Sequence, residues 1–489
     1  MWFFLAIAFI SLILYFYLKR NDNYWKHRGI PYTKPVFFFG NILNMIKGKE
    51  QTSEMLKTLY ESTTAPYIGF FMFDQPYLLI RDLDLIKNIL ITDFDYFSDR
   101  GAVTSEKDAV GSKLLFLLKG AAWRDLRRSS TCLFSMNKIK SLVPLINKIG
   151  DDLIEHLDKH LEKDVVDGRF LGLNFGVDVI SSCVFGFEAN AVRCSNSVFV
   201  KSALKLLEVT ISRGIQTVLC FFSPKLVNLL NLTFTDVTAT STLSSIFLRV
   251  CKDRKATGTK RGDFVDILNT MTMNGEELDD KHMAGLAIQM LLAGHETSGT
   301  TVGFLLYELC YNVDVQNRLH KEVKNVLKDN DNKISYETIN QMTYLDMVIN
   351  KILRKYPVVG FLDRICLTNY RVPGTNYTIE KGIPVIIPVY ALHQDDRYYS
   401  EPEKFDPERF SPDNKNSIPT CAYMPFGEGL RYCIGNQLAL LTIKIFIIKI
   451  LANFNIGCCK DTPKFIKFDT SSILLCPQKG ELKVKLIRI

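Results

Sequence analysis

Most apolar positions along this 489-residue chain recur with the spacing of helices. The pattern is mainly helical from about 140 to 320. Within it, residues 280–312 are apolar on nearly all sides, which predicts a helix buried in the centre of the molecule. Residues 436–451 predict another helix, directly after a glycine-rich loop.

Strand patterns are short. Residues 67–80 predict two strands joined near Pro76, and 82–91 predicts a following helix. Residues 376–390 contain strand-like runs broken by glycine and proline, and 464–489 predicts a hairpin. The chain is therefore predicted to be mainly α with a minor β region.

The first apolar stretch, 2–18, contains one polar residue, Ser11, and no charge. A helix of this length spans about 26 Å, the short end of a bilayer crossing. Lys19 and Arg20 follow it, no basic residue precedes it, and it has no small-residue cleavage site. This favours an uncleaved, single-pass anchor with the body on the cytosolic side over a cleaved signal peptide, which stays open as the alternative.

The predicted domain organisation has three parts. Residues 1–20 form the transmembrane anchor, and 21–36 form a proline-containing hinge. No linker, low-complexity segment or repeat interrupts the remainder, so 37–489 is predicted to be a single large domain.

Composition narrows the classes of partner. The hydrophobic content of 47% is ample for a large core, and the net charge of +8 comes without a block of lysine and arginine. Nucleic acid is therefore not expected as a partner. The twelve cysteines lack the spacing of a disulfide framework, so a cytosol-facing body should keep them reduced.

One cysteine has a motif around it. Cys433 lies in the run Pro-Phe-Gly-Glu-Gly-Leu-Arg-Tyr-Cys-Ile-Gly at 425–435, just before a predicted helix. A helix N-terminus stabilises negative charge and favours the thiolate. A single thiolate suits haem iron better than zinc, which requires three or four ligands. The alternative is a buried structural cysteine near a turn.

This run resembles the cysteine-ligand loop of the cytochromes P450, the haem-thiolate monooxygenases, and the resemblance extends from about residue 28 to the end. It implies the P450 fold and haem b, with Cys433 as the iron ligand and with Gly429 and Gly435 shaping the loop. Phe426 would pack beside the sulfur, and Arg431 would pair with a haem propionate.

The resemblance also assigns propionate partners outside the loop. Trp123 and Arg127 stand four residues apart and share a helix face. They and Arg364 match residues that contact propionates in the family. The alternative for each arginine is a surface position.

Gly294, Glu296 and Thr297 lie inside the long apolar segment and resemble the family's oxygen-activation motif. The glycine would leave room for dioxygen, while the hydroxyl and the carboxylate would deliver protons to it. The alternative is that Thr297 only bonds its own helix carbonyl.

The chain departs from the family at one position. Arg354, Glu408 and Arg409 match segments that form a buried Glu-Arg-Arg network, but Lys351 occupies the place of the glutamate. Three cations would then converge, and a buried uncompensated charge costs about 3–5 kcal/mol. Lys351 could turn outward, deprotonate or pair with Glu408.

The resemblance implies an enzyme that inserts one atom of O2 into a small apolar organic substrate. Its electrons would come from NADPH through a flavoprotein reductase docking near Arg124, Arg128 and Lys138. Expected partners are this reductase, the substrate and the lipid bilayer of the endoplasmic reticulum. The second hypothesis, resting on Lys351, is a membrane-anchored but catalytically impaired or silent homologue that binds haem or apolar ligands.

Substrate contacts are expected from the aperiodic segment 97–121, the apolar segment 214–234, residues 358–362 and residues 472–475. The segment 214–234 has two readings that the sequence leaves equal. It forms core helices joined by a turn near Pro224, or it dips into the membrane and admits substrate.

Overall fold

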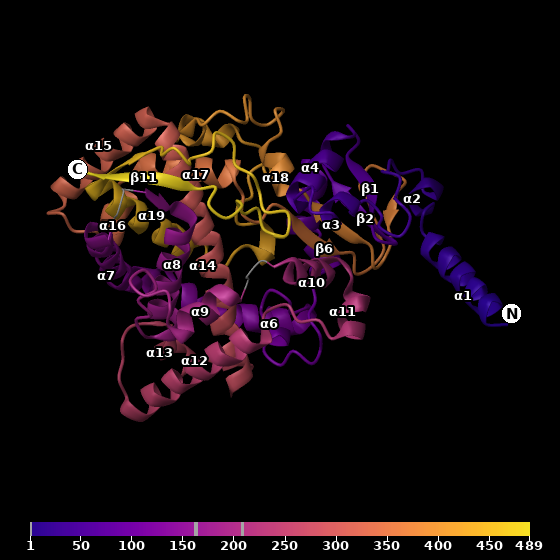
Figure 1. Cartoon of the computed structure of the whole chain (residues 1–489), viewed down its shortest axis with the longest axis horizontal. Helices are drawn as coiled ribbons and strands as arrows, with labels where there is room; N and C mark the ends of the chain where they lie inside the picture. Colours follow the sequence, from indigo (N-terminus) through magenta and orange to yellow (C-terminus); the bar gives the residue numbers. More distant parts are fainter. Residues whose placement is uncertain (1, 161–164, 207–209) are drawn as a thin grey trace.

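A long helix, α14 (Asp280–Tyr311), runs through the centre of the molecule, and other helices surround it (Figure 1). The computed structural model describes residues 2–160, 165–206 and 210–489. Nearly all side chains of α14 from Met283 onward are buried, which explains why its sequence shows no polar face. The predicted central helix is confirmed.

Helices are the main secondary structure of the chain. Those that precede α14 are α1 (Trp2–Lys19), α2 (Tyr24–His27), α3 (Leu43–Ile46), α4 (Thr52–Glu61), α5 (Leu83–Lys87), α6 (Gly120–Ser130), α7 (Met136–His160), α8 (Gly168–Ile180), α9 (Val198–Lys205), α10 (Ile211–Phe222), α11 (Pro224–Leu230), α12 (Val237–Thr257) and α13 (Phe264–Leu268). Those that follow it are α15 (Val313–Asp329), α16 (Tyr336–Asn340), α17 (Thr343–Lys355), α18 (Val389–His393) and α19 (Asn436–Asn453).

The strands form small sheets at the edges of this helical body. One sheet has the order β1-β2-β9-β6, with strands β1 (Tyr67–Met72), β2 (Gln75–Ile80), β9 (Pro384–Ile387) and β6 (Leu362–Ile365). The second has the order β10-β11-β3, with strands β10 (Phe454–Gly457), β11 (Lys483–Arg488) and β3 (Val165–Asp167). Two short hairpins pair β4 (Thr272–Met273) with β5 (Glu276–Glu277) and β7 (Tyr370–Arg371) with β8 (Thr378–Ile379).

The mainly α architecture with a minor β region agrees with the sequence prediction. The two strands within 67–80 pair antiparallel as expected. The helix expected over 82–91 is shorter, because α5 changes to a π-helical turn at Asn88–Thr92. The C-terminal hairpin prediction is wrong in its pairing. Only an isolated bridge joins Phe468 to Pro477, whereas β11 pairs with β10 and β3.

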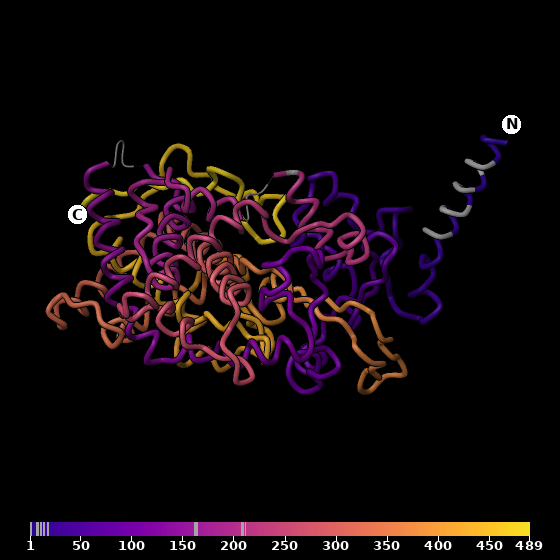
Figure 2. The backbone as a smooth tube through the Cα atoms, turned by 90° about the horizontal axis from the view of Figure 1, so that it is seen from below, coloured from indigo at the N-terminus to yellow at the C-terminus, as the bar shows by residue number. Residues whose placement is uncertain are grey.

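Helix α1 leads away from the body at the N-terminus, as Figures 1 and 2 both show. The segment after it is docked onto the first sheet. The indole of Trp25 is fully buried and donates a hydrogen bond to the Phe70 carbonyl at 3.1 Å. A Cβ on Gly69 would lie 2.4 Å from the Trp25 ring, so only glycine leaves room for this contact.

Among the described residues, one helix has both the length and the mean hydropathy of a membrane span. It is α19, and 61% of it is buried inside the body. Because it packs against α7, α14 and α15, it is part of the protein core.

Helices α8 and α14 approach each other through glycines. A Cβ on Gly299 would lie 2.6 Å from the Leu173 amide nitrogen, and one on Gly172 would lie 2.5 Å from the Gly299 carbonyl oxygen. The two backbones are therefore in direct contact, and this contact fixes α14 relative to the rest of the helical body.

We expect Gly299→Ala to destabilise the protein by about 1–3 kcal/mol, because the methyl group must displace backbone rather than a flexible side chain. This loss exceeds the gain of up to about 1 kcal/mol that alanine gives a helix. The matched control is Gly457→Ala, whose added methyl would meet Ile487 at an ordinary 3.8 Å. Urea unfolding measures both variants, and equal stability of the two would contradict the packing argument.

Candidate active site

The loop before α19 is shaped by glycines and brings Cys433 under α6. Gly427 and Gly429 have φ angles of 77° and 72°, in the left-handed region that favours glycine. A Cβ on Gly429 would stand 1.9 Å from the Leu90 carbonyl oxygen, so no other residue fits. The Cys433 amide then donates to the Phe426 carbonyl at 2.9 Å and closes the loop.

The Cys433 side chain is accessible although it lies deep in the molecule. Burial raises the pKa of its thiol, while the Gly435 amide and the charges of Arg127 and Arg100 act in the opposite direction. The sequence expectation of a thiolate-biased cysteine is therefore wrong for the free thiol, because desolvation outweighs the helix terminus. Binding to a metal would remove the proton.

Arg431 is almost fully buried two residues before this cysteine. Its guanidinium lies 4.1 Å from the centre of the Trp123 ring and donates to the carbonyls of Ser98 at 2.6 Å and Leu118 at 3.0 Å. Burial, and next the charge of Arg100, lower its pKa to about 9.

Arg364 comes from strand β6 and is 1% exposed. Its Nη1 donates to the Asp363 carbonyl at 2.7 Å, but its Nε has no hydrogen-bond partner among the described residues. Burial, and next the charge of Arg100, lower its pKa to about 9. Arg127 is half-buried and donates to the Tyr432 carbonyl at 2.8 Å. Arg364 and Arg431 are therefore not surface residues, and Arg127 is partly exposed.

Two further cations join this cluster that sequence reasoning missed. Arg100 forms a 3.3 Å ion pair with Asp363, and Lys119 is close enough to Asp99 and Asp363 for their charges to act on it. Both lie in the aperiodic segment 97–121, which was expected to face the substrate. Their positive charge in that segment was the signal that could have pointed to an anion-binding role.

The cluster fits a dianionic group such as haem with its two propionates. Its cations are Arg100, Lys119, Arg127, Arg364 and Arg431, whereas the carboxylates beside them are Asp99 and Asp363. Desolvated cations without matching anions are costly. The unpaired Arg364 Nε is a donor that a propionate would satisfy.

Helix α14 presents an accessible stripe in the middle of its buried length. Ala293 is exposed, and Gln289, Met290, Gly294 and Thr297 are partly exposed at helical spacing. A central helix can be accessible there only if the stripe borders an open space inside the molecule. Gln289 accepts a 3.1 Å bond from the amide of Phe116, and Arg431 binds Leu118 two residues on, so segment 97–121 joins this stripe to the arginine cluster.

The three motif residues on α14 lie in different surroundings. The Thr297 hydroxyl donates to the Ala293 carbonyl at 2.6 Å, the local bond that was the alternative reading. Gly294 makes room for Ile180, whose Cδ1 would lie 2.6 Å from a Cβ at that position. The absent side chain therefore serves helix packing as well as any ligand.

Glu296 is buried in an ion pair with Arg169 of α8 at 2.5 Å, and Thr300 donates to it at 3.3 Å. Burial acts to raise the pKa of this carboxyl, but Arg169 holds it below its usual range. The carboxylate is therefore committed to a structural pair, and no sequence pattern pointed to Arg169 as its partner.

The Glu-Arg-Arg positions come together around Lys351. Its side chain is fully buried, and its Nζ has no hydrogen-bond partner among the described residues. Burial, then Arg354 and Arg409, lower its pKa to about 6. Glu408 instead forms an ion pair with Arg318 on the surface. Of the three routes open to Lys351, turning outward and pairing with Glu408 are excluded, and deprotonation remains.

The two arginines of this network bind backbone oxygens. Arg354 donates to the carbonyls of His393 and Pro402, and Arg409 donates to that of Ser400. Burial lowers the Arg354 pKa to about 10. Carbonyl dipoles thus replace the missing carboxylate.

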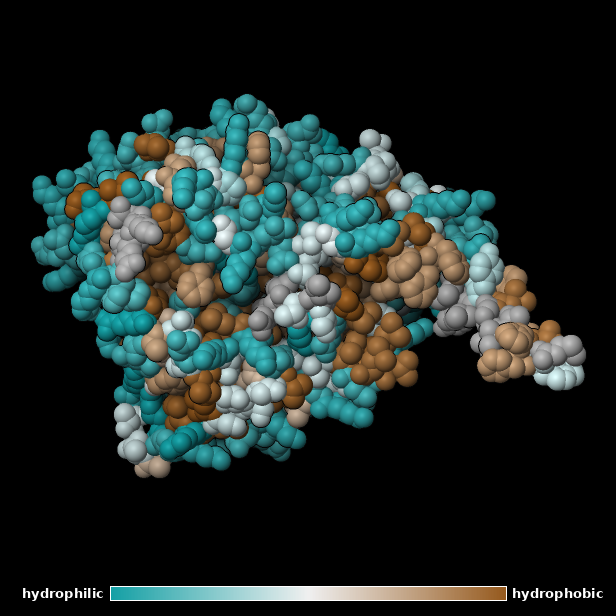
Figure 3. Space-filling model, in the orientation of Figure 1, coloured by the Kyte–Doolittle hydropathy of each residue, from teal (hydrophilic) through white to brown (hydrophobic). Residues whose placement is uncertain are grey.

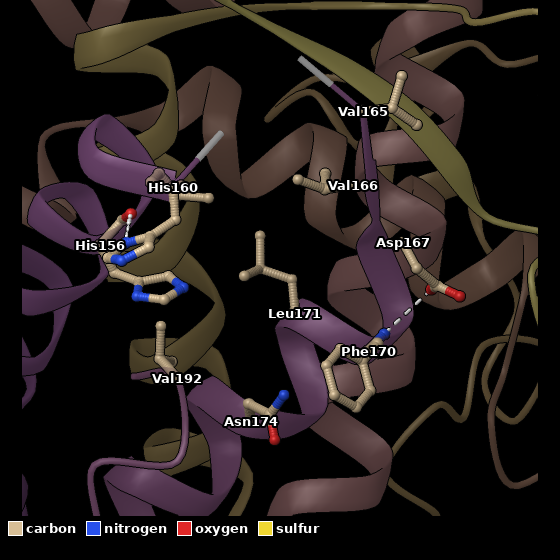
Figure 4. A pocket seen from close by; sticks show the side chains of 10 residues that line it. His156, His160, Val165, Val166, Asp167, Phe170, Leu171, Asn174 and Val192 are labelled. Atoms are coloured by element: carbon tan, nitrogen blue, oxygen red, sulfur yellow. Dashed lines mark hydrogen bonds between the residues drawn. The ribbon is translucent and has the colours of Figure 1, made fainter. Parts of the chain in front are cut away.

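A separate pocket of about 210 Å³ opens between α7, β3 and α8 (Figure 4). It is lined by the stacked rings of His156 and His160, by Asn174 and by apolar side chains. It contains none of the predicted site residues. Among the described residues, no group of three or more His, Cys, Asp or Glu side chains could hold a metal ion.

A lone cysteine in a glycine loop, facing buried arginines in a mainly helical body, is typical of haem-thiolate proteins. The family model "Cytochrome P450" matches residues 30–484, and the chain belongs to this family. Membership makes it a monooxygenase, an oxidoreductase that incorporates oxygen from O2. Haem b is its cofactor, and its electrons come from NADPH through a reductase.

Curated relatives match almost end to end. The chain is 36% identical to Cytochrome P450 6k1 of Blattella germanica, covering 97% of this chain and 95% of that protein. It is 37% identical to Cytochrome P450 6j1 of the same species, with 93% and 91% covered. It is 33% identical to Probable cytochrome P450 6w1 of Drosophila melanogaster, with 97% and 96% covered. These matches do not favour the silent-homologue hypothesis.

Lys351 should make stability rise with pH. Its folded pKa of about 6 lies below the unfolded value of 10.5, so between them only the unfolded chain carries the proton. Between these two values each pH unit changes the free energy of unfolding by about 1.4 kcal/mol, and the protein loses this stability as pH falls towards 6. We expect the free energy of unfolding to gain about 2 kcal/mol from pH 7.0 to 8.5, relative to Lys351→Met.

The control is Lys444→Met. Lys444 is also buried, but it forms an ion pair with Asp346 at 2.5 Å. Urea unfolding at both pH values should show the wild-type slope in this control and its absence in Lys351→Met. A slope that survives Lys351→Met would show that Lys351 stays charged.

Proposed function

We propose that Cys433 would bind the haem iron and that the arginine cluster would bind the propionates. The observation that carries the proposal is an accessible cysteine bordered by buried cations that outnumber their carboxylates. In this arrangement Arg364 and Arg431 bind propionate oxygens, with Arg127 and the Trp123 indole completing the set. Phe426 fixes the loop through its carbonyl, Gly429 sets the path of the backbone, and the Gly435 amide lies against the sulfur.

Haem held by these residues would supply the activation of O2, which a cysteine thiolate ligand favours. The chain's own residues position the proton supply. Thr297 lies on the accessible stripe of α14, and its hydroxyl is oriented by the Ala293 carbonyl. Glu296 is proposed to act as a positioning residue, because its ion pair with Arg169 holds α14 against α8. Gly294 lets α14 approach Ile180.

The proposed substrate is a small apolar organic molecule. Phenylalanines from three of the expected contact segments cluster together. Phe221 lies 6.0 Å from Phe116, 5.9 Å from Phe234 and 6.1 Å from Phe361, measured between ring centres. Such an aromatic wall favours apolar substrates and offers few polar groups for orientation.

The NADPH-dependent flavoprotein reductase is proposed to dock near α6. Arg128 is exposed there, and Arg124 pairs with Asp95 across the surface at 2.6 Å. Lys138 contributes less than its sequence position suggested, since its Nζ donates to the carbonyls of Gly262 and Asp263. Exposed basic side chains attract an acidic partner surface.

Helix α1 is proposed to anchor the protein in the endoplasmic reticulum membrane as a single span, with the domain 37–489 in the cytosol. Residues 21–36 link the two, and the burial of Trp25 against the first sheet favours a fixed connector over the hinge expected from sequence. Exposed apolar side chains on the body support a surface that also touches the bilayer. Leu229 is 74% exposed on α11, and Phe38 is 48% exposed. Figure 3 shows apolar surface on the side of the molecule from which α1 extends. This favours the membrane-dipping reading of the segment 214–234.

The reduced, carbon-monoxide difference spectrum tests the thiolate site. We expect the wild type to show the strongly red-shifted Soret band of a thiolate-ligated haem, and Cys433→Ser to lose it completely. Cys194→Ser is the control, because Cys194 is exposed and lies between α8 and α9, outside the motifs named above. An unchanged band in Cys433→Ser would overturn the proposal. A wild type without the band that gains it in Lys351→Glu would favour the silent-homologue hypothesis.

Thr297→Val tests the proton supply. We expect it to lower the ratio of oxygenated product to NADPH consumed by about 10-fold or more, since removing a group that delivers protons costs 10²–10⁴-fold in similar chemistry. The control is Thr301→Val, the same change one turn along α14, where the hydroxyl is buried and bonds the Thr297 carbonyl at 2.8 Å. Equal coupling in both variants would assign Thr297 a structural role only.

A further inference from the structure

Two thiols meet where the central helix ends. Cys310 is the penultimate residue of α14, and Cys458 directly follows strand β10. Their sulfur atoms are 3.0 Å apart although 148 positions separate them in sequence. The cysteine spacing predicted no such pair, because their proximity arises only when β10 packs beside α14.

The contact is held by the surrounding backbone. The Cys310 thiol also lies 3.1 Å from the carbonyl of Tyr307, and the Cys458 thiol lies 3.4 Å from the carbonyl of Cys310. Strand β10 is fixed in turn by its pairing with β11. A disulfide needs a sulfur separation of about 2.05 Å, so closure requires a movement of about 1 Å.

The two thiols differ in access. Cys458 is exposed, whereas Cys310 is 5% exposed. Burial raises the pKa of the Cys310 thiol well above its usual range, and the contact with Cys458 adds to this. A dissolved oxidant therefore reaches Cys458 first, and Cys310 is placed to act as the resolving thiol.

The adjacent Cys459 has a different environment. Its sulfur accepts a 3.3 Å bond from the Thr462 hydroxyl and lies 3.9 Å from the Lys483 carbonyl, near strand β11. It is only partly exposed. Although Cys459 is the sequence neighbour, Cys310 has the direct sulfur contact.

We propose that Cys310 and Cys458 form a reversible redox modification site that closes to a disulfide when hydrogen peroxide reaches Cys458. The Cys458 thiolate attacks one peroxide oxygen, giving a sulfenic acid and, after protonation of the leaving hydroxide, water. The Cys310 sulfur then displaces hydroxide from the sulfenic sulfur. It loses its proton, forms the S–S bond and releases a second water. The two thiols lose two electrons in total, and the peroxide gains them.

The disulfide would link the C-terminal end of α14 to the sheet β10-β11-β3. Helix α14 also carries Thr297 and its accessible stripe, so a covalent tie at its far end restrains the element that borders the proposed active site. A reducing cytosol returns the pair to thiols, which makes the closed form a response to peroxide rather than a permanent crosslink.

Peptide mapping of the full-length holoenzyme tests the site. The reduced protein is treated with hydrogen peroxide, its remaining thiols are alkylated, and it is digested without reductant. We expect the peptide pair joined through Cys310 and Cys458 to be the main crosslink, to disappear on treatment with dithiothreitol, and to be absent from Cys458→Ser.

The matched control is Cys459→Ser, which removes the neighbouring thiol and should leave the crosslink intact. Exposed Cys194 is the internal reference, and it should be alkylated or oxidised singly. A crosslink that joins Cys459 instead of Cys458, or peroxide oxidation of Cys458 to the sulfinic acid without any crosslink, would overturn the proposal. Both outcomes are independent of haem loading.

Discussion

Buried positive charge is the constraint on which the active site depends. Arg364 and Arg431 lie almost wholly inside the protein, and burial and neighbouring cations lower the pKa of each to about 9. Asp99 and Asp363 offset only part of this charge. Since isolated cations in a low-dielectric interior are costly, the fold is completed by a ligand that brings carboxylates. In the proposed arrangement haem would supply two, which would couple cofactor binding to the stability of this region.

The same constraint meets a different solution at Lys351. No anion approaches its Nζ to hydrogen-bonding distance, and the neighbouring Arg354 and Arg409 repel an ammonium group there. A pKa lowered to about 6 favours the neutral amine, and backbone carbonyls bind Arg354 and Arg409 in place of the expected glutamate. A neutral Lys351 avoids a third buried charge, and the remaining cost is the free energy of removing its proton. The network therefore stays compatible with a folded member of the family.

Helix α14 connects these features because its two sides are used differently. Its glycine face contacts α8 directly, and Glu296 locks the same interface through Arg169. Its accessible stripe, with Thr297, turns the other way. Sequence reasoning treated Gly294, Glu296 and Thr297 as one motif with one purpose. The structure divides them, because neighbours along a helix point about 100° apart and meet different elements.

The sequence by itself determined the helical class, the central helix, the antiparallel pair β1–β2 and the residues of the cysteine loop. The helices and strands follow from local periodicity. The loop follows from a motif whose glycines adopt backbone conformations that other residues rarely adopt. Tertiary structure alone decided the role of Arg100, the pairing of Glu296 with Arg169, the lowered pKa of Lys351 and the contact between Cys310 and Cys458. Each depends on which distant elements exclude water from a group and which charges they bring beside it, and no local pattern records that.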